Sequence, residues 1–233
     1  MSFFSQIPPH FLWVLGLILA FTVVKAVFAH IQSKKRRLDL GDMAEQMGMR
    51  FDPGKDRSFD SRYPFFEALR KGKKRYAFNT LTGAFDGREI VGFDYHYETS
   101  SGSGKRRSRT SHYFSAVILA CDVPISGLTI RPEGLFDRMK QFIGFDDINF
   151  ESAEFSKRFH IASKDREVAY DVVQPETMDI LLISPRFHLH FEQGFVMAMR
   201  KERFQPGDYR DAIRLIDDIL DRIPRSAHES LAM

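Results

Sequence analysis

The chain contains little cysteine and little tryptophan, with one residue of each among 233. A single cysteine, Cys121, excludes an intramolecular disulfide and a zinc site of paired cysteines, and it fits a reducing compartment. The aromatic residues are mostly Phe, which has no polar group, so we expect these rings in the core. Charged residues make up 28% of the chain, which excludes a polytopic membrane protein.

Charge is missing from Phe11 to Val24, and only Lys25 and His30 interrupt an apolar stretch that reaches Ile31. A bilayer core of roughly 30 Å needs about 20 helical residues, so the length predicts a membrane-spanning helix. The Leu, Ile, Phe and Val side chains of the uncharged run favour insertion by about 3 to 6 kcal/mol in total. Lys25 opposes insertion, but near the end of the span its long side chain reaches the headgroups.

No Lys or Arg precedes the apolar stretch, whereas four follow it: Lys34, Lys35, Arg36 and Arg37. Positive residues stay on the cytoplasmic side, so the pattern predicts an outside N-terminus and a cytoplasmic domain at the inner (plasma) membrane. A cleaved signal peptide is one alternative, although the basic start is missing and four cations would follow the cut. A buried core helix is another, although the uncharged run is longer than one core helix needs.

After the anchor, strand and helix patterns alternate irregularly. Residues 76–81, 89–97 and 112–121 predict strands, and 187–191 with 195–199 predict a hairpin around Gln193 and Gly194. In 89–97 the alternation places Asp94 and His96 on a solvent face. Residues 38–49, 64–72, 134–143, 167–173 and 175–182 predict short helices, 155–161 a strand, and 208–223 an amphipathic terminal helix.

Mixed strands and helices without regular βαβ repeats predict an α+β fold with a mainly antiparallel sheet. The expected organisation is a transmembrane anchor over 1–32, a basic juxtamembrane segment with a short helix over 33–60, a soluble domain over 61–225 and a tail over 226–233. Residues 52–62 are polar and rich in turn formers, which indicates a boundary there.

A resemblance covers about half of the chain. Within residues 147–181 it rests on Phe150-Glu151-Ser152 with Phe155 and Phe159, on Ser163, Asp165 and Ala169, and on Pro175, Met178 and Leu181. Residues 79–99 carry a second, weaker part of the pattern. The chain resembles a bacterial family of uncharacterised membrane-anchored proteins, a domain of unknown function. The resemblance implies an anchored α+β domain and supplies no catalytic residues.

Phosphate-binding and nucleophile motifs are missing. The stretch Ser101 to Ser108 has Thr99 where a phosphate-binding loop needs Gly, and Arg106 where it needs Ser or Thr. No G-x-S-x-G elbow occurs. The acidic residues at 146–154 lack the spacing of a calcium loop. The sequence therefore predicts no cofactor and no catalytic residue, and it favours a protein that is not an enzyme.

His188, His190 and Glu192 alternate along one predicted strand, so their side chains project from the same face. Two imidazoles and a carboxylate can share a metal ion. The competing interpretation is the polar face of an amphipathic strand, with Phe187, Leu189 and Phe191 toward the core.

Basic residues form clusters that the net charge of +3 conceals. The predicted membrane-surface residues are Lys34, Lys35, Arg36, Arg37, Lys73, Lys74, Arg75, Lys105, Arg106 and Arg107. Each cation near anionic lipid contributes about 1 kcal/mol, so the clusters can orient the domain on the inner leaflet. The alternative is that only the first cluster matters, as a topology signal. Binding of nucleic acid is not expected, since aromatic residues are missing from the basic loop.

The leading hypothesis is a non-enzymatic interaction or scaffold module with membrane lipids and an unidentified protein as partners. The alternatives are a metal-dependent enzyme at His188 and His190, and a sensor whose Phe-rich core encloses a small ligand.

Overall fold

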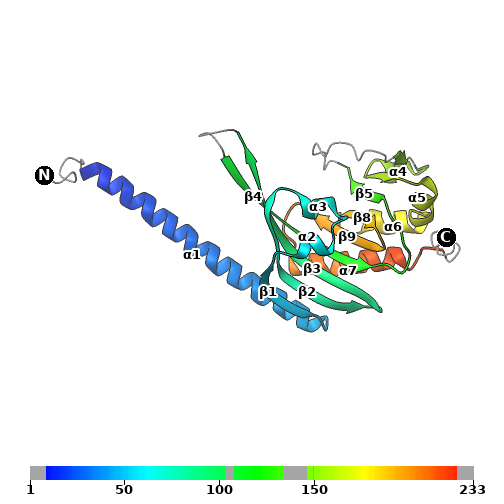
Figure 1. Cartoon of the computed structure of the whole chain (residues 1–233), viewed down its shortest axis with the longest axis horizontal. Helices are drawn as coiled ribbons and strands as arrows, with labels where there is room; N and C mark the ends of the chain where they lie inside the picture. Colours follow the sequence, from blue (N-terminus) through cyan, green and yellow to red (C-terminus); the bar gives the residue numbers. More distant parts are fainter. Residues whose placement is uncertain (1–8, 103–107, 134–145, 149, 225–233) are drawn as a thin grey trace.

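The computed structural model describes residues 9–102, 108–133, 146–148 and 150–224. A long N-terminal helix leads into one nine-stranded sheet with the strand order β1-β2-β3-β4-β9-β8-β5-β7-β6, in which every neighbouring pair is antiparallel. Helices cover both sides of this sheet (Figure 1). The predicted α+β fold with an N-terminal apolar helix is confirmed.

The strands are β1 (Arg50–Asp56), β2 (Lys73–Phe85), β3 (Arg88–Ser101), β4 (Ser108–Ala120), β5 (Leu128–Pro132), β6 (Asp146–Ile148), β7 (Phe159–Ser163), β8 (His188–Glu192) and β9 (Phe195–Arg200). The helices are α1 (Pro9–Gln46), α2 (Phe59–Arg62), α3 (Glu67–Arg70), α4 (Ala153–Ser156), α5 (Arg166–Val172), α6 (Pro175–Ile183) and α7 (Pro206–Leu220).

Helix α1 is continuous over 38 residues, where the sequence had predicted an anchor and a separate short helix. From Trp13 to Lys35 its side chains are exposed, and it projects away from the sheet (Figure 1). Within the described part of the chain, it is the one helix long and apolar enough to cross a membrane. Its last turns are different, because Leu40, Met43 and Ala44 are buried in the core. One helix therefore serves both as the apolar segment and as a structural element of the domain.

Tight turns join β2 to β3 and β8 to β9. Asp86 and Gly87 between β2 and β3 both have positive φ, as do Gln193 and Gly194 between β8 and β9. Two consecutive residues with positive φ are typical of the type I′ turn, whose twist matches that of the strands. The hairpin predicted around Gln193 and Gly194 is confirmed. Residues 50–56, which the sequence placed partly in a boundary segment, form the edge strand β1 paired with β2.

The two sides of the sheet carry different cores. On one side α1, α5, α6 and α7 pack over a large aliphatic core. On the other, α2 and α3 cover aromatic residues of β3 and β4, with the Phe59 and Phe93 ring centroids 4.4 Å apart. These rings pack directly against one another. Because β3 is covered on both sides, Asp94 (0% exposed) and His96 (5% exposed) are buried, and the predicted solvent face was wrong.

Residues 155–161 differ from the predicted strand, because Ser152 accepts a hydrogen bond from the backbone amide of Phe155 and starts the short helix α4 before β7 begins. Helices α5, α6 and α7 agree with the predicted helices to within a few residues. The predicted helix over 134–143 and the basic tip at 103–107 lie outside the described residues.

Candidate functional site

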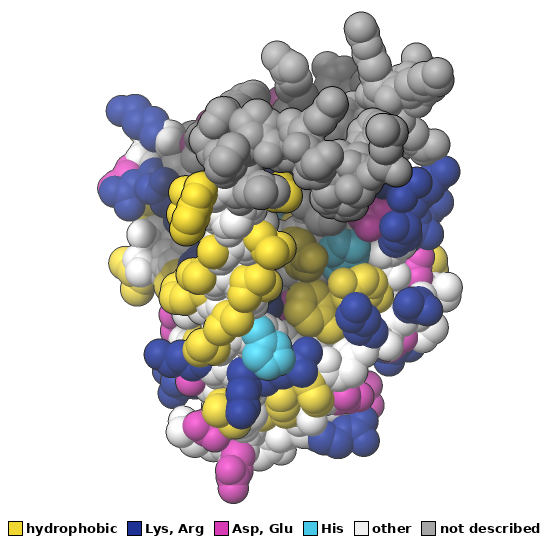
Figure 2. All heavy atoms as spheres, turned by 90° about the vertical axis from the view of Figure 1, so that its left-hand side faces the viewer, with side chains coloured by type: hydrophobic (Ala, Val, Ile, Leu, Met, Phe, Trp, Pro, Cys, Tyr) yellow, Lys and Arg dark blue, Asp and Glu magenta, His cyan; other side chains and the backbone are white. Residues whose placement is uncertain are grey.

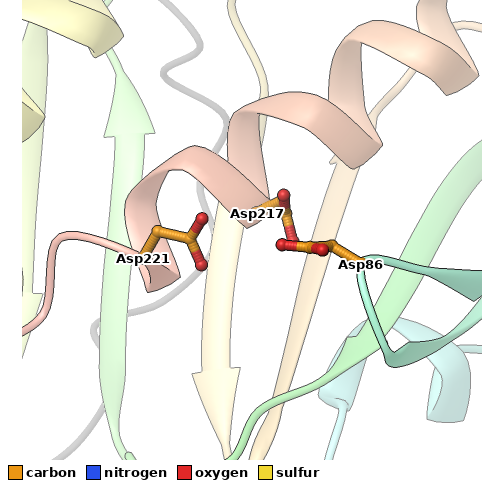
Figure 3. A group of neighbouring side chains, drawn as sticks. All are labelled: Asp86, Asp217 and Asp221. Carbon is orange, nitrogen blue, oxygen red and sulfur yellow. The ribbon is translucent and has the colours of Figure 1, made fainter.

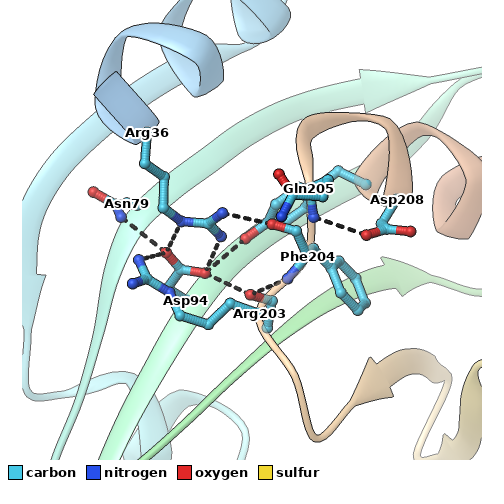
Figure 4. A network of polar contacts seen from close by, with 9 residues as sticks. Arg36, Asn79, Asp94, Arg203, Phe204, Gln205 and Asp208 are labelled. Atoms are coloured by element: carbon cyan, nitrogen blue, oxygen red, sulfur yellow. Dashed lines mark hydrogen bonds and ion pairs between the residues drawn. The ribbon is translucent and has the colours of Figure 1, made fainter. Parts of the chain in front are cut away.

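A buried carboxylate, Asp94 of β3, lies where the anchor helix meets the domain (Figure 4). Five side chains from separate parts of the chain donate hydrogen bonds to it: Arg36 of α1, Asn79 of β2, Ser115 of β4, Arg203 from the segment before α7, and Tyr209 of α7. Long-range contacts of this kind bring together elements that the sequence separates by more than a hundred residues.

Arg36 binds Asp94 with two nitrogens, Nε at 3.0 Å from Oδ2 and Nη2 at 2.7 Å from Oδ1. Its remaining nitrogen, Nη1, donates to the backbone carbonyl of Phe204 at 2.6 Å. Arg203 Nη2 reaches Oδ2 at 2.7 Å. The planar guanidinium suits such two-point recognition of a carboxylate. Arg36 therefore connects the anchor both to the sheet and to the segment before α7.

The charge balance of this cluster favours ionised Asp94. Burial raises the pKa of Asp94, but the hydrogen bonds and charges of Arg36 and Arg203 outweigh burial and lower the pKa to about 2. Burial, together with the charge of Asp94, raises the pKa of the Tyr209 hydroxyl. Near neutral pH, Asp94 is ionised and Tyr209 is protonated.

Asp94 has the hydrogen bonds of a structural ion cluster. Both of its oxygens accept from several donors, and general acid–base chemistry near neutral pH requires a pKa close to 7. We call Asp94, Arg36, Arg203, Asn79, Ser115 and Tyr209 the anchor latch. The anchor latch connects α1 to β2, β3, β4 and α7.

The histidine pair lies on the opposite side of the sheet from α1 and α7. The rings of His188 and His190 are 4.1 Å apart, as the alternation predicted. Glu192 does not complete three ligands, because its carboxylate accepts from Ser126 and from the Gly127 amide (3.2 Å). Burial, and then the nearby cations Arg131 and Lys71, lower the pKa of His190 to about 4. The pair is neutral near pH 7, and metal binding there stays a prediction.

Three carboxylates at the other end of α7, Asp86, Asp217 and Asp221, also lie close enough to share a cation (Figure 3). Arg88 already occupies this position, since it forms ion pairs with Asp217 and, at 2.8 Å, with Asp221. Arg88 therefore neutralises much of the charge that would attract a metal ion. We call these four residues the Arg88 cluster.

The predicted membrane-surface residues take different positions. Lys34, Lys35 and Arg37 are exposed on α1 directly after the apolar segment, whereas Arg36 turns inward to the anchor latch and is not a surface residue. Lys73 is exposed. Lys74 pairs with Glu98 at 3.0 Å and Arg75 with Asp60 at 2.8 Å, so both have partners within the domain. Lys105, Arg106 and Arg107 lie outside the described residues.

Sequence reasoning missed the anchor latch because it treated all four cations after the span alike. One signal was available: Arg36, Leu40, Met43 and Met47 recur at spacings of three and four, which places them on one helical face. That face is the one α1 turns to the domain. Asp94 carried no comparable signal, since alternation alone assigns a charged residue to the solvent side.

No family model and no curated protein matches the chain. A solved structure does. The crystal structure of the mycobacterial trehalose monomycolate transport factor A, TtfA, is similar with a TM-score of 0.59 and 10% sequence identity. The match covers 80% of this chain and 93% of that one. At this identity the likeness shows a shared fold. The resemblance to a bacterial family of unknown function stays a prediction.

Proposed function

We propose that this chain is a membrane-anchored interaction module without catalysis of its own, held by α1 against the inner leaflet and serving a membrane transport system. The observation that supports it best is helix α1, whose apolar segment is fully exposed and whose last turns are buried in the domain and held by the anchor latch. The transport role comes from the similar fold of TtfA, which is named as a transport factor.

The spacing along α1 supports a position of the domain close to the membrane. Ile31 ends the apolar segment and Leu40 is the first fully buried residue, so about 14 Å of helix separates them. Lys34, Lys35 and Arg37 lie in this interval, where headgroups of an anionic leaflet would meet them. Figure 2 shows the molecule from the side on which α1 projects, with Lys and Arg side chains to both sides of the apolar helix.

A short rigid connection suits an interaction module more than an enzyme that must reach a diffusing substrate. A flexible linker would let the domain sample many orientations. The continuous helix with its latch instead presents the same surfaces of the domain to the bilayer and to neighbouring membrane proteins. In this proposal, Lys73 and the basic residues Lys105 to Arg107 are the cations that contact lipid.

Topology is tested by single-cysteine labelling. In a chain with Cys121→Ser, an Arg57→Cys variant of the exposed segment after β1 is treated with a membrane-impermeant maleimide. We expect labelling in lysed cells and none in intact spheroplasts. Ser2→Cys, before the apolar segment, should be labelled in intact spheroplasts as well as in lysed cells. Labelling of Arg57→Cys in intact spheroplasts would place the domain outside and contradict the proposal.

Lipid contact is tested separately, with the full chain in nanodiscs. A fluorophore at Lys73→Cys should be quenched by headgroup spin labels more strongly in discs that contain phosphatidylglycerol than in pure phosphatidylcholine. Replacing Lys105, Arg106 and Arg107 by Gln should remove this difference. The matched control replaces Lys157, Arg214 and Arg222, which are exposed elsewhere on the domain, and should keep it.

A further inference from the structure

The β3–β4 hairpin extends beyond its neighbouring strands. β3 and β4 pair without interruption from Ile90 opposite Leu119 to Ser101 opposite Ser108. β2 leaves this ladder at Lys73, opposite Glu98, and β9 ends at Arg200, opposite Ser115. Among the described residues, no strand pairs with the outer edge of β4 from 108 to 114. Figure 1 shows this part of the hairpin standing clear of the remaining elements.

The free edge lacks the features that usually block strand addition. Natural edge strands are protected by bulges, Pro or several charged side chains. Register shifts occur between β1 and β2 and between β2 and β3, but none occurs between β3 and β4. Residues 108–114 contain no Pro and one charged side chain, Arg109. Seven residues of extended strand offer about 23 Å of backbone donors and acceptors.

Side-chain contacts between β3 and β4 order this edge strand. The ring of Tyr97 stacks on His112 with centroids 4.7 Å apart and planes 14° from parallel, and the Thr99 hydroxyl lies 2.7 Å from His112 Nε2. Further in, Tyr95 packs against Phe114 at 5.2 Å. An incoming segment would therefore meet a strand that is already ordered, which reduces the entropy lost on binding.

The side chains of β4 set the chemistry of a partner. Arg109 and Tyr113 are four residues apart, so both project from the same side of the strand. Both are exposed, and Tyr113 keeps 46% of its surface accessible although it is aromatic. On a paired strand, an acidic residue opposite Arg109 and an apolar residue opposite Tyr113 would form the favourable cross-strand pairs.

We propose that the outer edge of β4, from Ser108 to Phe114, binds an extended segment of another membrane protein that carries an acidic and an apolar residue four positions apart. The inference rests on the proposed function, because an anchored module meets segments that lie beside the membrane. In Figure 1 the N-terminal end of α1 and the free end of the hairpin lie on the same side of the molecule. The binding edge is thus on the side of the bilayer.

A second copy of this chain is a less favourable partner for the edge than a different chain. Antiparallel pairing of two β4 edges reverses one hairpin relative to the other, so the two α1 helices would point in opposite directions and could not enter one membrane from the same face. Parallel pairing in register sets Arg109 beside its counterpart, and like charges directly opposite each other are unfavourable. The partner is therefore a different chain.

The test uses the full chain in phosphatidylcholine nanodiscs, with a fluorescent heptapeptide Thr-Val-Thr-Ile-Thr-Glu-Thr as the probe. Antiparallel pairing with β4 sets its Val opposite Tyr113 and its Glu opposite Arg109. We expect saturable binding by fluorescence anisotropy, weakened about tenfold by Arg109→Glu. A probe with Lys in place of Glu should bind Arg109→Glu better than it binds the unchanged chain. Arg57→Glu, an exposed reversal outside the hairpin, should bind as the unchanged chain does.

The inference is overturned by absence of binding, by equal binding by the chain with Arg109→Glu, or by equal binding of a probe whose Ile is replaced by Pro, which cannot pair. An effect of Arg109→Glu seen only as lost quenching by lipid in phosphatidylglycerol discs would make the hairpin a lipid contact, and would also overturn it. These failures leave the proposed function standing when Arg57→Cys is labelled only in lysed cells. Conversely, an outside domain would contradict the proposed function whatever the probe does.

Discussion

Two aspartates contact arginine, Asp94 in the anchor latch and Asp217 in the Arg88 cluster. The pKa of Asp94 is lowered and that of Asp217 is raised. Burial raises the pKa of both. At Asp94 two arginines outweigh burial and bring the pKa to about 2. At Asp217 the hydrogen bond and charge of Arg88 lower the pKa, but Asp221 and Asp86 oppose it and the pKa stays raised. The ratio of cations to carboxylates decides the difference.

This difference separates a fully buried ion cluster from one that is partly exposed. The anchor latch has two guanidinium groups for one carboxylate, and Asp94 is fully buried. The Arg88 cluster has one guanidinium for three carboxylates, of which Asp86 and Asp221 are exposed. Removing a carboxylate is costly when it leaves buried cations without their counterion, as at Asp94, and less costly when the cation keeps another partner, as Arg88 keeps Asp221. Substitutions in the two clusters should therefore differ in size.

The largest effect is expected for Asp94→Asn. It leaves Arg36 and Arg203 without their shared counterion, and breaking a buried pair typically costs about 3 to 5 kcal/mol. Urea unfolding of the full chain in detergent, followed by circular dichroism, measures this loss, and hydrogen exchange should rise over residues 36–46. Asp218→Asn, an exposed residue of α7, is the control. A loss below about 1 kcal/mol for Asp94→Asn would contradict the role of the anchor latch.

Acid should weaken the domain through Asp94. The folded pKa of about 2 lies below the ordinary value of 3.8, so the contribution is complete above about pH 4 and is lost as the pH falls through about 2. A shift of this size corresponds to about 2 to 3 kcal/mol. Asp217, with its raised pKa, has the opposite sign, because its contribution falls as the pH rises through its folded pKa. Unfolding free energies measured from pH 2 to 6 should show the acid loss, and Asp94→Asn should flatten it.

A smaller effect is expected for Tyr209→Phe. It removes one donor to Asp94, the hydroxyl at 3.1 Å, and leaves both arginines in place. A hydrogen bond to a charged group contributes about 1.5 to 3 kcal/mol, so the loss should lie in that range. Tyr170→Phe, which alters an exposed tyrosine, serves as the control in the same unfolding measurement. A loss as large as that of Asp94→Asn would mean that Tyr209 acts through packing.

The smallest effect is expected for Asp217→Asn. Arg88 keeps Asp221 as a partner, and removing a carboxylate from an acidic cluster relieves repulsion. The change in unfolding free energy should therefore be the smallest of the three substitutions. A loss comparable with that of Asp94→Asn would remove the distinction between the two clusters. A stabilisation of the Asp217→Asn chain would sharpen it.

Periodicity predicted the elements that depend on local pattern. The apolar segment, helix α7 and the hairpin at Gln193 and Gly194 could all be predicted, because each has a regular repeat or a turn with its own residue preference. The junction between the anchor and the domain could not be predicted in this way. A change from exposed to buried side chains does not interrupt a helix, so one continuous α1 looked like two elements with a basic linker between them.

In the candidate sites, too, local pattern predicted some features and distant contacts decided the others. The strand alternation that brings His188 and His190 together could be predicted, but Glu192 is drawn away by Ser126 and the Gly127 amide, which are distant in sequence. Arg36 was read as one of four surface cations, although its spacing from Leu40 placed it on the inner face of the helix. Asp94 was assigned to solvent because alternation cannot report a sheet covered on both sides.

The sequence by itself determined that an apolar helix precedes an antiparallel α+β domain, since length, hydrophobicity and period are properties of short segments. Only the tertiary structure decided how the two are joined. The anchor latch draws its donors from residues 36, 79, 115, 203 and 209, and nothing local links these positions. A buried charge is stable only when its partners surround it, and which partners do so is settled when the chain packs.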